Sequence, residues 1–311
     1  MPIVVVGNVF VDIKGFPEGR YIPAGRNSGW VEIVHGGVGR NVVEDIANLE
    51  LRPRFVSMVD DTAQGEDVLR KLNNHKVDTR FVVRVPDGMG MWLVVHDESG
   101  DIVSSISKRP QMDAMVELLE EHGDEIFADA DSVVLEIDMD KEVIKQVFRY
   151  TRKYGKPVIA LVANMSIASQ RRDFLQSTDC FVCNVQEAGI LFADEFEGLR
   201  PEEMSRELAG RLSSARIPSM VVTMGGDGAV YADMGGSCGV CPAQSVPVRD
   251  TAGAGDAFCA GVAVGLTYGK SLMASCEIGT RLAASVIMIS ENTCPRFLPE
   301  ELGLDLSARR S

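Results

Sequence analysis

Short, continuous apolar runs alternate along this chain with longer segments in which apolar positions recur every three or four residues. The continuous runs predict buried strands, and the longer period predicts amphipathic helices. The predicted strands are Ile3–Val6, Phe55–Met58, Ser132–Leu135, Val158–Val162, Cys180–Cys183 and Met220–Thr223. The predicted helices are Asn41–Leu49, Gly65–Asn74, Gln111–His122, Lys141–Tyr154, Pro201–Ser214 and Asp256–Thr267, with a final helical pair over Ser271–Ser290. This alternation is typical of an α/β fold with a mainly parallel central sheet covered by helices.

Two segments interrupt the alternation with β-like patterns of their own. Residues 12–35 are rich in Gly and Pro and contain the strand Trp30–Val34. Residues 88–107 contain a predicted hairpin, with strands Gly90–His96 and Asp101–Ile106. We expect these segments to form a small β lid over the carboxyl edge of the main sheet, where open α/β folds bind ligands. No linker or repeat divides the chain, so a single domain over residues 1–311 is predicted.

Composition narrows the class of protein. The 311 residues are 45% hydrophobic and 24% charged, which is typical of a compact globular protein. The net charge of −14 argues against nucleic acid or an anionic membrane as a partner. No apolar run approaches the ~20 residues of a membrane span, and the start of the chain lacks a basic leader segment. We therefore expect a cytoplasmic protein whose seven cysteines are reduced.

Two cysteine pairs, Cys180-x-x-Cys183 and Cys238-x-x-Cys241, have the spacing of zinc ligands. The first pair falls in a predicted strand, where positions three apart face opposite sides, so we interpret both residues as small buried hydrophobes. The second pair has a more turn-like context. A zinc-stabilised regulatory protein therefore stays open as an alternative.

The segment Asp250-Thr251-Ala252-Gly253-Ala254-Gly255-Asp256 combines a glycine loop with a carboxylate. Gly253 and Gly255 lack a Cβ, so backbone N–H groups there can approach an anion closely. Asp256 begins an apolar helix whose positive end favours the same anion. The pattern predicts a phosphoryl-transfer site with Asp256 as general base. The alternative is a glycine-rich turn before a buried helix.

Three further segments place polar groups at the ends of strands or the starts of helices. Gly36-Gly37-Val38-Gly39-Arg40-Asn41 ends in an amide that can both donate to and accept from vicinal hydroxyls. Asn184-Val185-Gln186-Glu187 offers an amide and a carboxylate suited to Mg²⁺. Thr223-Met224-Gly225-Gly226-Asp227-Gly228 suits nucleotide phosphates. Each segment alone is also compatible with a simple turn or a helix cap.

Taken together, the four segments resemble, in order and spacing from near residue 3 to residue 295, the ribokinase family, also called the PfkB carbohydrate kinase family. The resemblance implies a three-layer ribokinase-like fold with a β lid. It also implies ATP-dependent phosphorylation of a hydroxymethyl group of a sugar or nucleoside, with Mg²⁺ as cofactor.

The resemblance also assigns roles to individual residues. Asp256 is the base, and Gly253, Ala254 and Gly255 form an anion hole for the migrating phosphoryl group. The substrate-binding residues are Phe10, Asp12, Gly36, Gly37, Arg40, Asn41 and Glu136. The nucleotide-binding residues are Asn184, Thr223, Gly225, Gly226, Gly228 and Asn292. Glu187 organises Mg²⁺, and Asp250 lies where many relatives bind a monovalent cation such as K⁺.

Within the family, residues 36–41, 224–228 and 290–295 look most like pseudouridine kinases. Phe10 stands where ribokinases usually have Asn, so an aromatic ring can stack there on a base, the alternative being a place in the core of the lid. Arg40 can support a nucleobase, the alternative being a solvated side chain. Lys108 and Arg109 instead suit a phosphorylated sugar, as in a phosphofructokinase-type enzyme. A sensor protein that lost catalysis is a further alternative, against which the intact Asp256 and Glu187 argue. Exposed lid strands predict a homodimer.

Overall fold

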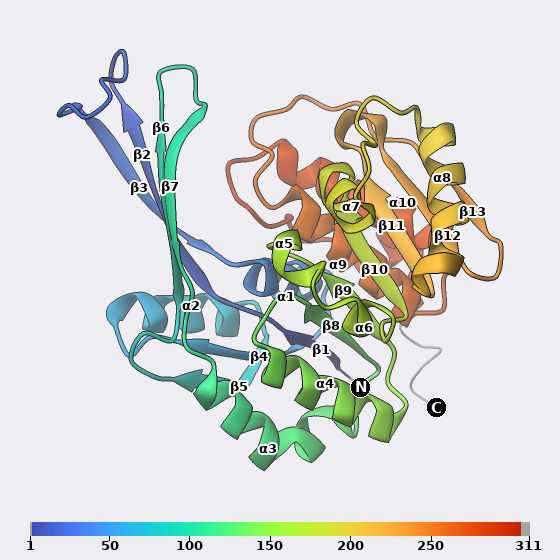
Figure 1. The fold of residues 1–311 in the computed structure, drawn as a ribbon. Coiled ribbons are helices and arrows are strands. Elements are labelled where there is room, and N and C mark those ends of the chain that lie inside the picture. The colour runs from blue at the N-terminus through green and yellow to red at the C-terminus, as the bar shows by residue number, and fades with distance from the viewer. Residues whose placement is uncertain (1, 306–311) are drawn as a thin grey trace.

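The computed structural model describes residues 2–305, and its centre is a nine-stranded sheet (Figure 1). The strand order is β13-β12-β11-β10-β9-β8-β1-β4-β5, with all neighbours parallel except β12 and β13. The strands are β1 (Ile3–Val6), β4 (Arg54–Val59), β5 (Asp78–Arg84), β8 (Ser132–Glu136), β9 (Val158–Leu161), β10 (Cys180–Asn184), β11 (Ser219–Thr223), β12 (Ala229–Asp233) and β13 (Cys238–Cys241). The predicted α/β fold class is confirmed.

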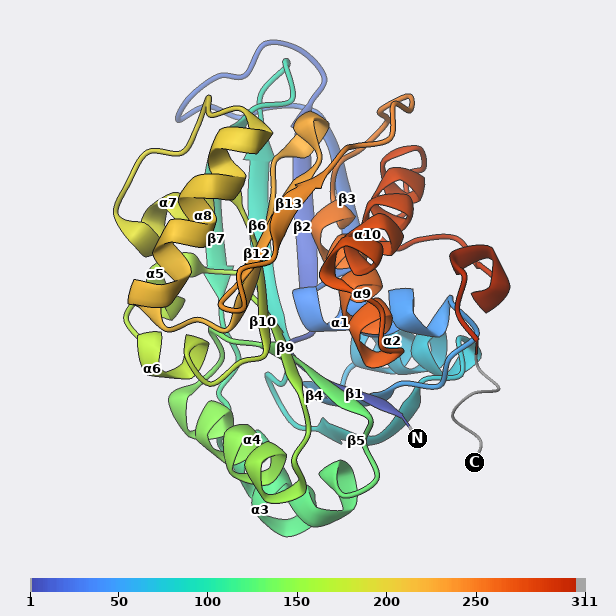
Figure 2. The same cartoon turned by 90° about the vertical axis from the view of Figure 1, so that its right-hand side faces the viewer.

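Helices cover both faces of this sheet, as Figure 2 shows. One face carries α1 (Val38–Ala47), α2 (Ala63–Asn74), α9 (Ala254–Thr267) and α10 (Leu272–Ile287). The other carries α3 (Asp113–Phe127), α4 (Lys141–Tyr154), α5 (Met165–Ala168), α6 (Arg172–Leu175), α7 (Val185–Phe192) and α8 (Pro201–Ala215). Because successive strand residues point to opposite faces, Val4 and Val6 join one core and Ile3 and Val5 join the other.

A separate four-stranded sheet, called the lid sheet below, projects away from the main sheet (Figure 1, blue and teal). Its strand order is β3-β2-β6-β7. The strands are β2 (Phe10–Pro17), β3 (Gly29–Gly36), β6 (Gly90–His96) and β7 (Ile102–Lys108). In register, Asp12 of β2 lies beside Trp92 of β6. Segments about 80 residues apart in sequence therefore build one surface.

The structure corrects two predictions about secondary structure. The final helical pair over Ser271–Ser290 is a single helix, α10, whose interior Gly279 lies against Gly261 of α9. A Cβ on Gly261 would lie 2.5 Å from the Cα of Gly279, so these glycines allow close helix packing instead of interrupting α10. The supposed turn around Cys238 is strand β13, an edge strand too short for a hydrophobic pattern to reveal.

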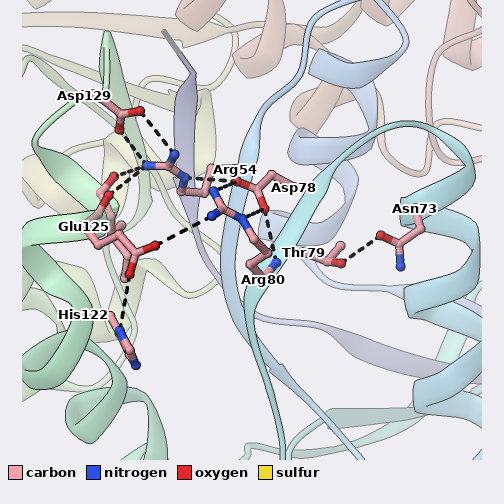
Figure 3. Close-up of polar contacts among 9 residues, drawn as sticks. Arg54, Asn73, Asp78, Thr79, Arg80, His122, Glu125 and Asp129 are labelled. Atoms are coloured by element: carbon pink, nitrogen blue, oxygen red, sulfur yellow. Dashed lines mark hydrogen bonds and ion pairs between the residues drawn. The ribbon is translucent and has the colours of Figure 1, made fainter.

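Edge strand β5, which the hydrophobic pattern did not predict, is tied to the sheet by polar contacts (Figure 3). Arg54 of β4 is buried, and its guanidinium lies between Asp78 of β5 and Asp129 beyond α3. Its Nη1 also donates to the carbonyl oxygen of Ile126 at 2.6 Å. A buried guanidinium needs such partners to offset its lost hydration. The network therefore anchors the end of α3 and β5 to the same strand.

Within residues 2–305, none of the helices combines the length and apolar character needed to cross a lipid bilayer.

Candidate active site

Two cavities meet where the start of α9 faces the carboxyl ends of the central strands. The larger, of about 700 Å³, lies between the lid sheet and the main sheet. The smaller, of about 200 Å³, lies at the ends of β9, β10 and β11. Asp256, in the first turn of α9, lines both cavities. This carboxylate therefore lies where groups bound in the two cavities would meet.

The environment of Asp256 suits a proton acceptor. Burial raises the pKa of Asp256 to about 7, while a hydrogen bond from Asn41 opposes the shift and the nearby Glu187 adds to it. Asn41 Nδ2 donates to Asp256 Oδ2 at 2.7 Å. Below about pH 7 the carboxyl is protonated and cannot accept a proton, whereas above that pH the carboxylate form dominates. This value lies near neutral pH, where a general base is most effective.

The glycine loop before α9 has a conformation that only glycine adopts without strain. Gly253 is the N-cap of α9 with φ of 79°, in the left-handed region. A Cβ on Gly253 would lie 2.0 Å from the carbonyl oxygen of Asn292. The loop is thus packed closely against the backbone of Asn292. The Ala254 N–H donates to the Thr251 carbonyl at 3.3 Å, which closes the turn before α9.

The floor of the larger cavity carries buried acids and amides from several elements. Glu136, at the end of β8, accepts from the backbone N of Asn8 at 2.8 Å and from its Nδ2 at 2.7 Å. Burial, with the neighbouring Asp138, raises the pKa of Glu136 to about 7. Burial also raises the pKa of Asp12, which lies on the lid sheet above. These groups offer both donors and acceptors to a polyhydroxylated ligand.

One face of the lid sheet supplies the roof of the larger cavity. It contributes Phe10, Asp12, Lys14, Trp92 and Ser107. Sequence reasoning predicted Phe10 and Asp12 but missed the other three. The two-residue period of β2 could have added Lys14, because it shares a face with Asp12. Trp92 and Ser107 could not be placed, since the pairing of β2 with β6 is long-range.

The smaller cavity gathers the residues predicted to hold a metal and nucleotide phosphates. It is lined by Asn184, Glu187, Thr223 and Gly255 together with Asp256. Glu187 Oε2 accepts from the backbone N of Asn184 at 2.8 Å in a capping box that starts α7. One carboxylate beside the amide and hydroxyl groups of this small cavity fits Mg²⁺, which keeps most of its waters. Burial raises the pKa of this carboxyl group of Glu187.

Several residues predicted from the sequence lie outside these two cavities. Gly36 packs against the carboxylate of Asp12. Gly225 and Gly226 are exposed in a 3-10 turn, Gly225–Asp227, after β11, and the adjacent Gly228 is buried. Asp250 is exposed, and its carboxylate accepts from the backbone N of Ala252 at 2.9 Å.

Two predicted residues lie away from the ligands assigned to them. Arg40 does not line the cavity wall; its side chain is 1% exposed and forms an ion pair with Glu44 behind that wall. Asn292, assigned to the nucleotide, instead lines the larger cavity with Asn41. Sequence spacing places a residue near a loop, but the direction of its side chain depends on packing.

The two cysteine pairs are placed apart in the structure. Cys180 and Cys183 lie in β10 and face opposite cores, as predicted for a strand. Cys238 is exposed, whereas Cys241 is buried. Across residues 2–305, no cluster of three or more His, Cys, Asp or Glu side chains is arranged to hold a metal ion.

Lys108 and Arg109, which suggested a phosphorylated sugar, are each paired with a carboxylate. Lys108 Nζ lies 2.5 Å from Asp87. Arg109 Nη2 lies 2.7 Å from the buried Asp138, and Nη1 donates to the Asp138 carbonyl. Neither cation is left without a counter-charge to meet a substrate phosphate.

Comparison with known proteins identifies the family and the fold. A family model described as pfkB family carbohydrate kinase matches residues 2–293. A guanosine-inosine kinase of Exiguobacterium acetylicum is 33% identical over 292 residues, covering 93% of this chain and 95% of that protein. A pseudouridine kinase of Escherichia coli is 26% identical over 263 residues, covering 84% and 82%. The structure of Arabidopsis thaliana ribokinase complexed with ribose and ATP matches at TM-score 0.81 and 23% identity, covering 97% and 98%, which shows the shared fold.

Proposed function

We propose that this chain, which belongs to the pfkB family of carbohydrate kinases, uses ATP to phosphorylate the hydroxymethyl group of a nucleoside. The observation that carries the proposal is the position of Asp256 between an acceptor-sized cavity and a smaller cavity lined by Glu187 and Thr223. The acceptor occupies the larger cavity, and the triphosphate of ATP reaches the smaller one. The family is one of phosphotransferases with an alcohol acceptor.

In this proposal Asp256 removes the proton of the acceptor hydroxyl. The hydroxyl oxygen then forms a bond to the γ-phosphorus while the bond from that phosphorus to the bridging oxygen of ADP breaks. Backbone N–H groups of Gly253, Ala254 and Gly255, with the positive end of α9, stabilise the charge on the transferring group. Mg²⁺ held by Glu187 would neutralise part of the phosphate charge. A K⁺ site at Asp250 stays a prediction, testable by replacing KCl with NaCl in the assay.

The lid surface favours a nucleoside over a free sugar. Phe10 and Trp92 present aromatic rings to the larger cavity, and such rings stack on bases. The guanosine-inosine and pseudouridine kinases among the relatives point the same way. We therefore rank guanosine and inosine first, because the guanosine-inosine kinase has the higher identity, and pseudouridine, which the motifs favour, second. We rank a sugar-phosphate substrate lower, because Lys108 does not line the larger cavity and Arg109, which does, is already paired with Asp138.

A substrate panel tests this proposal. We expect ATP consumption with guanosine, inosine or pseudouridine at a kcat/KM at least about tenfold above that with ribose or fructose 6-phosphate. That factor corresponds to about 1.4 kcal/mol of transition-state binding from the base. Coupled ADP release measures turnover, and mass spectrometry locates the added phosphate. A preference for fructose 6-phosphate would support the phosphofructokinase-type alternative, and no turnover with any acceptor would support a non-catalytic sensor.

We also propose a homodimer formed through the outer face of the lid sheet. Ile33, Ile13, Leu93 and Ile106 lie in one row across its four strands, on the face opposite Asp12 and Trp92. Ile33 and Ile106 are 57% and 67% exposed, which is unfavourable unless another surface covers them.

We expect sedimentation velocity at micromolar concentration to show a dimer for the wild-type protein and a monomer for Ile33→Asp/Ile106→Asp. The physical reason is that two buried carboxylates would oppose the apolar contact. Met234→Asp, at an equally exposed apolar residue in the turn after β12, is the matched control and should leave the dimer intact. A monomeric wild-type protein would contradict this proposal.

A further inference from the structure

Helix α1 carries a buried ion pair that the proposed chemistry does not use. Arg40 and Glu44 are each 1% exposed, and Arg40 Nη2 lies 2.7 Å from Glu44 Oε2. Burying two charges costs more hydration energy than such a pair usually returns, so apolar residues of similar size would serve stability as well. Stability of the fold alone therefore does not explain why this position has a buried ion pair.

The other terminal nitrogen of Arg40 contacts two active-site amides. Nη1 donates to Asn41 Oδ1 at 2.7 Å and to Asn292 Oδ1 at 3.1 Å. Because the amide oxygens of Asn41 and Asn292 face Arg40, their amide nitrogens face away from it and donate to other groups. Asn41 Nδ2 donates to Asp256 at 2.7 Å, and Asn292 Nδ2 donates to the His35 carbonyl at 2.9 Å.

The orientation of each amide matters for the residues beyond it. If the Asn41 amide turned over, its oxygen would face the carboxylate of Asp256, and two acceptors would oppose each other. The backbone carbonyl of Asn292 lies against Gly253, so movement of Asn292 would disturb the glycine loop. A group that holds both oxygens thus holds both the base and the loop in place.

We propose that Arg40 is a positioning residue that fixes the amide orientations of Asn41 and Asn292, and through them the placement of Asp256 and the Gly253 loop. Glu44 holds the guanidinium in this position. The Thr293 hydroxyl, which donates to Glu44 Oε1 at 3.0 Å, in turn orients Glu44. The inference rests on the proposed role of Asp256 as base.

An arginine is suited to this task because its guanidinium is planar and has several donors in fixed directions. One terminal nitrogen can serve two amide oxygens while the other is bound to Glu44. A lysine ammonium is a single point of charge on a flexible stem. It can neutralise Glu44, but it cannot hold both amides in the same geometry.

The test separates positioning from folding by changing both members of the pair. Arg40→Met alone leaves Glu44 buried without its main counter-charge and should lower Tm and kcat together. Arg40→Met/Glu44→Gln removes both charges and keeps the bond from Thr293. We expect this double variant to regain a Tm close to that of the wild-type protein. Its kcat for the nucleoside should stay lower by on the order of 10²-fold, with KM for ATP within about twofold.

Two further variants complete the design. Arg40→Lys should keep Tm and lose at least about tenfold in kcat, which decides the matter if the double variant does not fold. Lys71→Met removes the other cation beside Glu44, whose Nζ lies 3.2 Å from Oε1, and should leave kcat unchanged.

The outcomes are distinct. Recovery of kcat together with Tm in the double variant, or wild-type kcat in Arg40→Lys, would overturn the inference and leave Arg40 as a counter-ion to Glu44. A rise in KM for the nucleoside without loss of kcat would also overturn it, because Arg40 would then act on substrate binding. A wild-type protein without turnover on the substrate panel would contradict the proposed function itself, and this inference with it.

Discussion

Replacing Asp256 by Asn is expected to lower kcat by about 10²- to 10⁴-fold, which is the usual contribution of a positioned general base. Asn has the same shape but cannot take the hydroxyl proton. The residue lies between the two cavities, so the change should leave each cavity able to bind its ligand. Steady-state turnover measures the loss, and calorimetric titration with ATP should give a Kd within a few-fold of the wild-type value.

The matched control is Asp113→Asn. Both residues lie in the first turn of a helix, Asp113 in α3 and Asp256 in α9. Asp113 is exposed, and α3 lies on the face of the sheet opposite α9. Its replacement also removes one negative charge from the first turn of a helix and should not change kcat. Turnover of Asp256→Asn within about tenfold of the wild-type protein would refute the assignment of the base.

Replacing Gly253 by Ala is expected to lower kcat by on the order of 10²- to 10³-fold, the cost of disturbing a group of anion-stabilising donors. The new Cβ would lie 2.0 Å from the Asn292 carbonyl oxygen at a φ of 79°. The loop must therefore move, and its N–H groups no longer meet the charge that develops on the phosphoryl group. Pre-steady-state measurement of the transfer step reports the loss directly.

Gly269→Ala provides the control for backbone strain. Gly269 follows α9 with φ of 74°, and a Cβ there meets nothing within 4 Å. The control shares the strained conformation, which costs about 1 kcal/mol, but not the clash or the site. It should lower Tm slightly and leave kcat unchanged. Equal kcat for both alanine variants and the wild-type protein would show that the Gly253 loop takes no part in transfer.

Much of the fold followed from local patterns, because a buried strand between two helical layers is apolar on both faces. The predicted run Ile3–Val6 is β1 without change, and Lys141–Tyr154 is α4. The family is confirmed by the match over residues 2–293. Edge strands such as β5 and β13 were missed. Polar residues and partial exposure interrupt the apolar run in β5, and β13 has only four residues.

Some residues of the candidate site could be predicted from the sequence and others could not, depending on how far apart in the chain the contacting residues lie. Asp256 and Gly253 could be recognised because the loop and the helix that follows it are contiguous. A few neighbouring residues therefore contain both the carboxylate and the glycine that the proposed reaction needs. Trp92 could not be recognised, since it reaches the cavity only through the pairing of β2 with β6. The burial of Arg40 against Glu44 could not be predicted either, because sequence spacing says nothing about which side of α1 faces the interior.

By itself the sequence determined the alternation of the central strands with helices, the glycine loop at Gly253 and the family to which the chain belongs, because each depends on residues close together in the chain. Only the tertiary structure decided which carboxylate lies between the two cavities and which residues line the lid. It alone also showed that Arg40 is bound to Asn41, Asn292 and Glu44. Those relations join residues up to 252 positions apart. They exist only once long-range strand pairing and helix packing have brought the segments together.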